Sequence, residues 1–139
     1  MGQIKEDYVS FETARLLKEK GFDGQCLSKY NSNGCIWDNI RYDGMLLGNN
    51  DIFPQEYLAP TLQMVMKWLR EKHNKIIVPG ISLDDRTSST INHYTVGIWY
   101  IPENNGGAFC YTSPTPYNGY SSFEEACEAG IKYCLENLI

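Results

Sequence analysis

The stretch YTVGIWYIPENNGGAFCYT, residues 94–112, decides the fold that this sequence predicts. Residues 94–101 alternate between the two sides of an extended chain, and both sides are partly apolar, which predicts a central strand. The segment PENNGG then turns the chain, so that residues 108–112 return as an antiparallel partner. The sequence therefore predicts a hairpin at the centre of an antiparallel sheet.

Three stretches with apolar residues at helical spacing surround this hairpin in the sequence. Ser10 can cap the first, and Asn74 can end the second. Pro60 suits the first turn of the second helix, where its missing N–H costs nothing. Ser122 and Glu125 form a capping box at the start of the third. Helices are therefore predicted over residues 11–20, 59–73 and 122–138.

Short strands are predicted in the intervening sequence. Residues 26–30 and 35–37 flank the turn-forming tetrapeptide NSNG, and residues 40–47 form a third short segment. Residues 76–83 predict an edge strand or a bulge, because Pro79 cannot donate a ladder hydrogen bond. The element order is α-β-β-(β)-α-β-β-β-α. The fold class is α+β, with a largely antiparallel sheet of four to five strands packed with about three helices.

Length and composition predict one domain. A chain of 139 residues with 42% hydrophobic and 21% charged residues has the size and balance of a single core. We expect a flexible N-terminal segment over residues 1–9 and a single α+β domain over residues 10–139. No stretch approaches the roughly 18 consecutive apolar residues of a membrane span, and the start MGQIKEDYVS lacks the apolar core of a signal peptide. These features predict a cytoplasmic protein that does not bind a membrane.

The five cysteines form no C-x-x-C pair, and because their number is odd they cannot all pair within the chain. On a shared helix, Cys127 and Cys134 would lie about 10 Å apart along the axis, too far to bond. We predict reduced, buried thiols. The cysteines are Cys26, Cys35, Cys110, Cys127 and Cys134.

No set of residues converges on a catalytic, metal or phosphate site. The predicted hairpin places Cys110 opposite Trp99 or Tyr100, far from His93. The spacing of the two histidines and of residues 84–85 (Asp-Asp) matches no metal-binding motif, and no phosphate-loop motif occurs. We therefore expect no cofactor and no metal, and a protein that is not an enzyme.

Aromatic residues and one basic segment are the candidate binding surfaces. Aromatic residues make up 13% of the chain, and Tyr and Trp are favoured where a partner buries a surface. The segment 67–75 is basic in a chain of net charge −5, whereas residues 124–136 are rich in Glu. Such asymmetry can steer a partner or drive self-association, although charge runs are usually solvated helix faces. The candidate partner-binding residues are Trp37, Tyr42, Lys67, Arg70, Lys72, Tyr111, Tyr117 and Tyr120.

Three phrases of the sequence resemble a known group of proteins. These are SFETARLLKEKGFD (10–23), APTLQMVMKWLREKH (59–73) and SFEEACEAGIKYCLENLI (122–139). They resemble small uncharacterised proteins encoded by phages, prophages and mobile elements of gut bacteria, over nearly the whole chain from Tyr8 onward. The resemblance implies an accessory role and synthesis in the cytoplasm of a host bacterium, and it carries over no active residues.

The function predicted from the sequence is protein binding. We expect a non-enzymatic accessory protein that binds a protein partner and self-associates as a homodimer. One alternative is a nucleic-acid-associated phage factor that uses the basic helix face of residues 67–75. The other is a small metal-dependent or hydrolytic enzyme built around His93 and residues 84–85.

Overall fold

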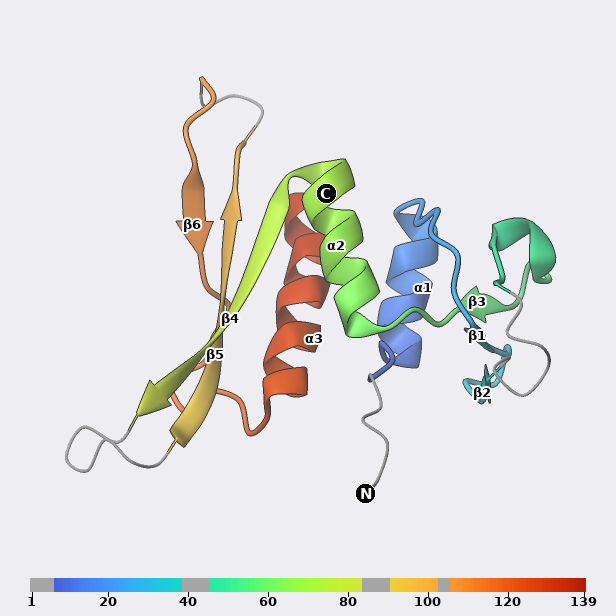
Figure 1. Ribbon diagram of the computed structural model, residues 1–139, viewed down its shortest axis with the longest axis horizontal. Helices are drawn as coiled ribbons and strands as arrows, with labels where there is room; N and C mark the ends of the chain where they lie inside the picture. The colour runs from blue at the N-terminus through green and yellow to red at the C-terminus, as the bar shows by residue number, and fades with distance from the viewer. Residues whose placement is uncertain (1–6, 39–45, 84–90, 103–105) are drawn as a thin grey trace. The chain divides into compact units, whose positions relative to one another are not determined.

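The computed structural model describes residues 7–38, 46–83, 91–102 and 106–139 (Figure 1). These residues form three α-helices and two three-stranded antiparallel sheets. The α+β class, the antiparallel pairing and the element order are as predicted. The strands differ from the expectation in one respect, since they form two sheets of three instead of one sheet of four to five. The strands that precede the middle helix in the sequence pair only with one another, and so do the strands that follow it.

The elements have the following bounds. The helices are α1 (Phe11–Glu19), α2 (Leu62–His73) and α3 (Phe123–Tyr133), with a short 3-10 helix η2 (Asn49–Asp51) and a π-helical end η3 (Cys134–Leu138). The strands of one sheet, in the order β2-β1-β3, are β2 (Ile36–Asp38), β1 (Ser28–Tyr30) and β3 (Tyr57–Leu58). Those of the other, in the order β4-β5-β6, are β4 (Lys75–Leu83), β5 (Ile91–Tyr100) and β6 (Cys110–Thr112).

The chain divides into two compact units, Met1–Trp68 (the first unit) and Leu69–Ile139 (the second unit). The length predicted a single domain over residues 10–139. Nothing in the composition marks the division, because it falls inside helix α2 and not in a Pro- or Gly-rich linker.

The N-terminal segment is only partly described. Residues 1–6 lie outside the described residues. Tyr8 pairs with Thr61, and Val9 is fully buried with its N–H donating to the Pro60 carbonyl at 3.0 Å. Residues 7–9 are therefore fixed by backbone pairing and by burial, in contrast to the flexible segment expected over residues 1–9.

Local signals set the start and end of α1 in the first unit. The Ser10 hydroxyl oxygen accepts a hydrogen bond from the Thr13 backbone N–H at 3.2 Å, as expected of an N-cap. Gly21, with φ of +79°, follows the helix in the left-handed conformation that glycine permits. The predicted hairpin is confirmed as β1 and β2, in which Lys29 pairs with Trp37. The third strand of this sheet is β3. Of the third segment predicted over residues 40–47, residues 40–45 lie outside the described residues, and Leu47 forms an isolated bridge with Cys26.

Helix α2 begins at Leu62, two residues after Pro60. Pro60 does not open the helix, because its carbonyl accepts from Val9 while Thr61 is held extended against Tyr8. The Thr61 hydroxyl then accepts from the Met64 N–H at 3.3 Å. Asn74, with φ of 54°, follows the helix as predicted.

Strand β5 lies at the centre of the sheet of the second unit, between β4 and β6. Strand β4 is an edge strand, as Pro79 predicts. Helix α3 packs on β4 and β5, as Figure 1 shows. Its predicted N-cap is confirmed, since the Ser122 hydroxyl accepts from the Glu125 N–H at 3.1 Å. The Glu125 carboxylate accepts from the Ser121 N–H at 3.2 Å, one residue before the position that a capping box uses.

Gly130 brings α3 close to the sheet. A Cβ at this position would lie 2.8 Å from a Val96 methyl and 3.1 Å from an Ile77 methyl. The core under the helix contains the fully buried side chains of Val96, Ile98, Cys127, Ile131, Cys134 and Leu135.

All five cysteines are free thiols, and Cys26, Cys127 and Cys134 are buried as predicted. Burial raises the pKa of Cys127 to about 11 and that of Cys134 to about 12, so both remain neutral thiols near pH 7. Cys35 is exposed and Cys110 is half-buried, so the prediction of burial is wrong for these two. Cys35 lies directly before β2 and Cys110 lies in β6, and each of these strands is at the edge of its sheet.

Candidate protein-binding site

One side of the β4-β5-β6 sheet is covered by α3, and the other side is exposed. The pairs Ile77–Ile98 and Pro79–Val96 lie on the side of α3. Because successive side chains of a strand point to opposite faces, the intervening pairs lie on the other side. We call that side the outer face, and its residues are Ile76, Val78, Gly80, Thr95, Gly97, Trp99 and Tyr111.

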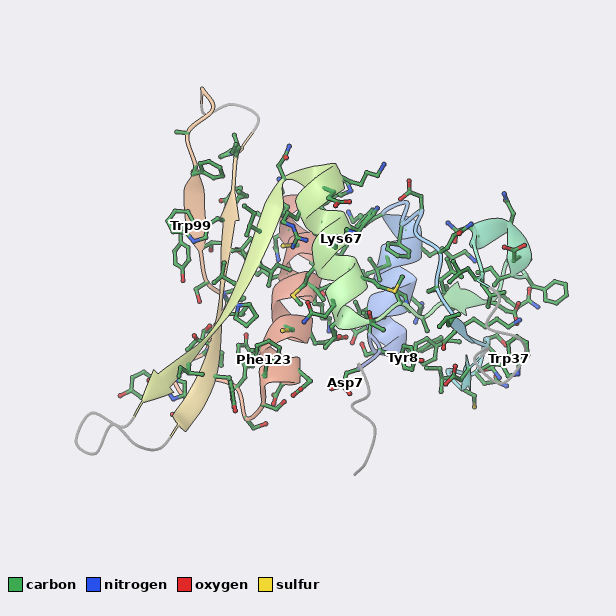
Figure 2. All side chains as sticks on the ribbon, viewed as in Figure 1. Asp7, Tyr8, Trp37, Lys67, Trp99 and Phe123 are labelled. Atoms are coloured by element: carbon green, nitrogen blue, oxygen red, sulfur yellow. The ribbon has the colours of Figure 1, made fainter. Side chains whose placement is uncertain are left out.

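Large apolar side chains dominate the outer face. Trp99 is 44% exposed, Val78 46% and Tyr111 56%, and Phe109, two residues before Tyr111, is also exposed. Trp99, labelled in Figure 2, lies on the side of the sheet away from α3. None of the residues of the outer face carries a charge. An exposed apolar patch of this kind is typical of an interaction surface.

Two aromatic rings are held against each other on this face. The Trp99 and Tyr111 rings lie 4.9 Å apart between centroids and are tilted by 53°. The Tyr111 ring lies across Gly97, where a Cβ would come within 2.4 Å of the tyrosine oxygen. The glycine therefore leaves the space that Tyr111 occupies. The pair forms a firm apolar centre, the type of feature found at the energetic centres of interfaces.

After β6, the chain still runs beside β5. Side-chain hydroxyls, instead of backbone groups, form the hydrogen bonds that hold it there. The Ser113 hydroxyl donates to the Val96 carbonyl at 2.7 Å, and the Val96 N–H donates to the Thr115 hydroxyl at 3.0 Å. Pro114 and Pro116 have no N–H to donate, so the hydroxyls take over the pairing. Regular pairing resumes at Tyr120, which bridges Tyr94.

The candidate residues of this loop have different surroundings. Tyr117 is 99% exposed. The Tyr120 hydroxyl donates to the Pro114 carbonyl at 3.1 Å, and burial, followed by the charge of Glu125, raises the Tyr120 pKa. Tyr120 is thus a structural residue of the loop, whereas Tyr117 is available to a partner.

The other candidate residues do not join the outer face. Tyr42 lies outside the described residues. Trp37 is on strand β2 of the first unit, with the Lys29 ammonium 4.8 Å from its ring centroid. The basic residues Lys67, Arg70 and Lys72 are exposed on α2, the first of them in the first unit and the other two in the second.

Lys29 also forms an ion pair in the first unit. Its Nζ lies 2.8 Å from Glu56 Oε2, and Oε1 of the same carboxylate accepts from the Phe53 N–H at 2.8 Å. The hydrogen bond from Lys29, followed by that from the Phe53 backbone, lowers the pKa of Glu56. Glu56 thereby ties the turn before β3 to β1.

The Glu56 pair predicts a loss of stability in acid. A carboxyl whose folded-state pKa is lowered stabilises the fold above its ordinary pKa of 4.5, and this stabilisation is lost as the pH falls through the lowered value. Lys29→Met is expected to reduce the difference in free energy of unfolding between about pH 7 and about pH 3, measured by urea denaturation. Lys72→Met, which removes an exposed cation, is the control and should keep the wild-type difference. Equal differences in all three proteins would contradict the assignment.

The residues considered for chemistry do not come together. Cys110 pairs with Tyr100, as predicted, while His93 pairs with Ser82 at the other end of the β4-β5 hairpin. Tyr100 and His93 are seven positions apart on the extended chain, a separation of about 23 Å. Residues 84–85 lie outside the described residues.

The described residues hold neither a metal-binding cluster nor a membrane-spanning helix. Within 7–38, 46–83, 91–102 and 106–139, no three His, Cys, Asp or Glu side chains are grouped so that they could hold a metal ion. In the same ranges, no helix combines the length and the apolar character that crossing a membrane requires.

Comparison with known proteins gives no relative. The chain matches no protein-family model, no curated protein and no solved structure. The candidate site therefore rests on its own geometry.

Sequence reasoning found Tyr111 but missed Ile76, Val78 and Trp99 as surface residues. The apolar residues on both sides of residues 94–101 predicted a central strand, which is confirmed, but did not predict which face stays exposed. Strand β5 is central in its hydrogen bonding, yet only its α3 side is covered in the described structure. The alternation of residues showed which side chains share a face of the strand, but it could not show whether a helix covers each face.

Proposed function

We propose that this chain is a non-enzymatic accessory protein that acts by protein binding and self-associates as a homodimer through the outer face. The observation that carries the proposal is an exposed, uncharged sheet face centred on the Trp99–Tyr111 pair. The sequence phrases that resemble phage and mobile-element proteins support the accessory role.

A second copy is the occupant that this face suits best. A foreign partner is usually selected by complementary charge, and the outer face offers none. Two antiparallel sheets, by contrast, pack readily with their apolar faces together, about 10 Å apart. A two-fold dimer uses the same patch on both copies, so an apolar face is its own complement.

The size of the face limits the strength of the dimer. With nine residues in β4, at about 3.3 Å each and with strands about 4.8 Å apart, the outer face covers roughly 300–400 Å² per copy. Standard interfaces bury about 800 Å² per partner. We therefore expect a weak homodimer, with a dissociation constant on the order of 10–100 μM.

Sedimentation velocity over a concentration series tests this proposal. The weight-average mass is expected to rise from that of a 15.9 kDa monomer towards twice that value. The association should also strengthen between about 50 and 500 mM NaCl, because salt screens the repulsion between two chains of net charge −5 while the contact itself is uncharged.

Two results would contradict the proposal. One is a monomer at every concentration up to about ten times the expected dissociation constant. The other is an association that weakens steeply with salt, which would indicate head-to-tail pairing of the basic α2 with the acidic start of α3.

We also propose that the protein works in the cytoplasm of a host bacterium. The five free thiols support this location, because a reducing compartment keeps thiols unpaired.

A further inference from the structure

A rigid turn carries the most exposed aromatic side chain of the described residues. The Gly119 N–H donates to the Pro116 carbonyl at 2.9 Å, which closes a turn around Tyr117. Tyr117 is 99% exposed. The ring therefore makes almost no contact with its own chain, although the turn that carries it is fixed.

Several separate contacts hold this turn. The Ser113 and Thr115 hydroxyls bond to the Val96 backbone, and the Tyr120 hydroxyl bonds to the Pro114 carbonyl. Gly119 adopts a φ of +68°, and a Cβ there would lie 2.0 Å from the His93 ring. The two prolines restrict the backbone further. The loop is thus ordered before any partner arrives, which removes the entropy cost of ordering it on binding.

The turn lies at the rim of the outer face. Gly119 packs against His93, which lies on the same side of β5 as Thr95, Gly97 and Trp99 because side chains alternate along a strand. Tyr117, two residues from Gly119, is therefore placed near the end of the outer face opposite to the end that Trp99 occupies.

We propose that Tyr117 is the second anchor of the homodimer interface, the ring of each copy packing on the other copy. This inference rests on the proposed self-association through the outer face. The outer face covers only about half of the area of a standard interface, so contacts from its rim are needed. A tyrosine ring adds large apolar area at little entropy cost.

In a symmetric dimer, a substitution of Tyr117 changes the interface at two places. In a two-fold dimer each copy contributes one ring, so a single substitution in the gene removes two contacts. If each buried ring contributes roughly tenfold, Tyr117→Ser is expected to weaken the homodimer roughly 100-fold. The mixed dimer of one wild-type and one Tyr117→Ser chain should be weakened only roughly tenfold.

Fluorescence anisotropy measures both constants, with a dye-labelled tracer titrated by unlabelled protein. Tyr117→Phe, which keeps the ring, should bind as wild type does. Phe53→Ser is the matched control, because it removes an aromatic ring that is 66% exposed but lies in the first unit, and its dissociation constant should not change. Unchanged thermal unfolding of Tyr117→Ser checks that the turn still folds.

The outcomes separate this inference from the proposed function. If wild type dimerises and Tyr117→Ser dimerises within twofold of it, the role of Tyr117 is refuted and the outer face remains the interface. If wild type does not dimerise at all, the proposed function fails as well. A mixed dimer as weak as the variant homodimer would contradict the prediction that each copy contributes one Tyr117 ring to the interface.

Discussion

Val78→Lys is expected to make the protein monomeric, raising the dissociation constant of the homodimer at least about 100-fold. Val78 lies in the middle of the outer face, opposite Gly97 on the neighbouring strand. A two-fold dimer would bury a lysine from each copy, so both charges would lose water and face a like charge in an apolar contact. The isolated chain should keep its stability within about 0.5 kcal/mol, because the side chain is 46% exposed on an edge strand.

Sedimentation velocity of Val78→Lys, beside wild type at matched concentration, measures this effect. Ile81→Lys is the matched control, because Ile81 is 52% exposed on the same strand but, by alternation, faces the other side of the sheet. It carries the same added charge and should dimerise as wild type does. A Val78→Lys protein that dimerises normally, or an Ile81→Lys protein that is equally monomeric, would show that the outer face is not the interface.

Gly130→Leu is expected to lower the free energy of unfolding by about 3 kcal/mol or more. Leucine is a good helix former, so the substitution by itself favours α3. The first added carbon, however, would lie 2.8 Å from a methyl of Val96, a buried and β-branched residue of β5 that has little freedom to move. The rest of the side chain has no space, so α3 must move off the sheet.

Urea denaturation followed by circular dichroism measures this loss, and Gly130→Ala gives a graded comparison. Alanine should cost about 1–2 kcal/mol, less than leucine because only one carbon is added. At an exposed helix position the same change would instead stabilise the protein by about 1 kcal/mol. A Gly130→Ala protein that is more stable than wild type would therefore show that α3 does not pack closely at this point.

Several features of the fold were predictable because their causes lie within a few residues. The Ser10 and Ser122 caps depend on a hydroxyl and a backbone N–H three positions away. The edge position of β4 follows from the missing N–H of Pro79. The partner of Cys110 follows from counting residues through a hairpin.

Other features were not predictable because they depend on distant segments. Helix α2 begins two residues after Pro60 since the stretch from Asp7 to Val9 pairs with the residues before the helix, more than 50 positions away. The exposure of Trp99 depends on α3 covering only the opposite side of β5. Strand β5 carries apolar residues on both faces, so its sequence did not show which face stays uncovered.

The sequence by itself determined the fold class, the order of the elements and the N-caps of α1 and α3, because capping, turn and alternation signals act locally. Only the tertiary structure decided how the strands divide into two sheets and which apolar face remains uncovered. Those outcomes follow from which segments bury one another, and burial is a property of the whole packed chain and not of any stretch of it.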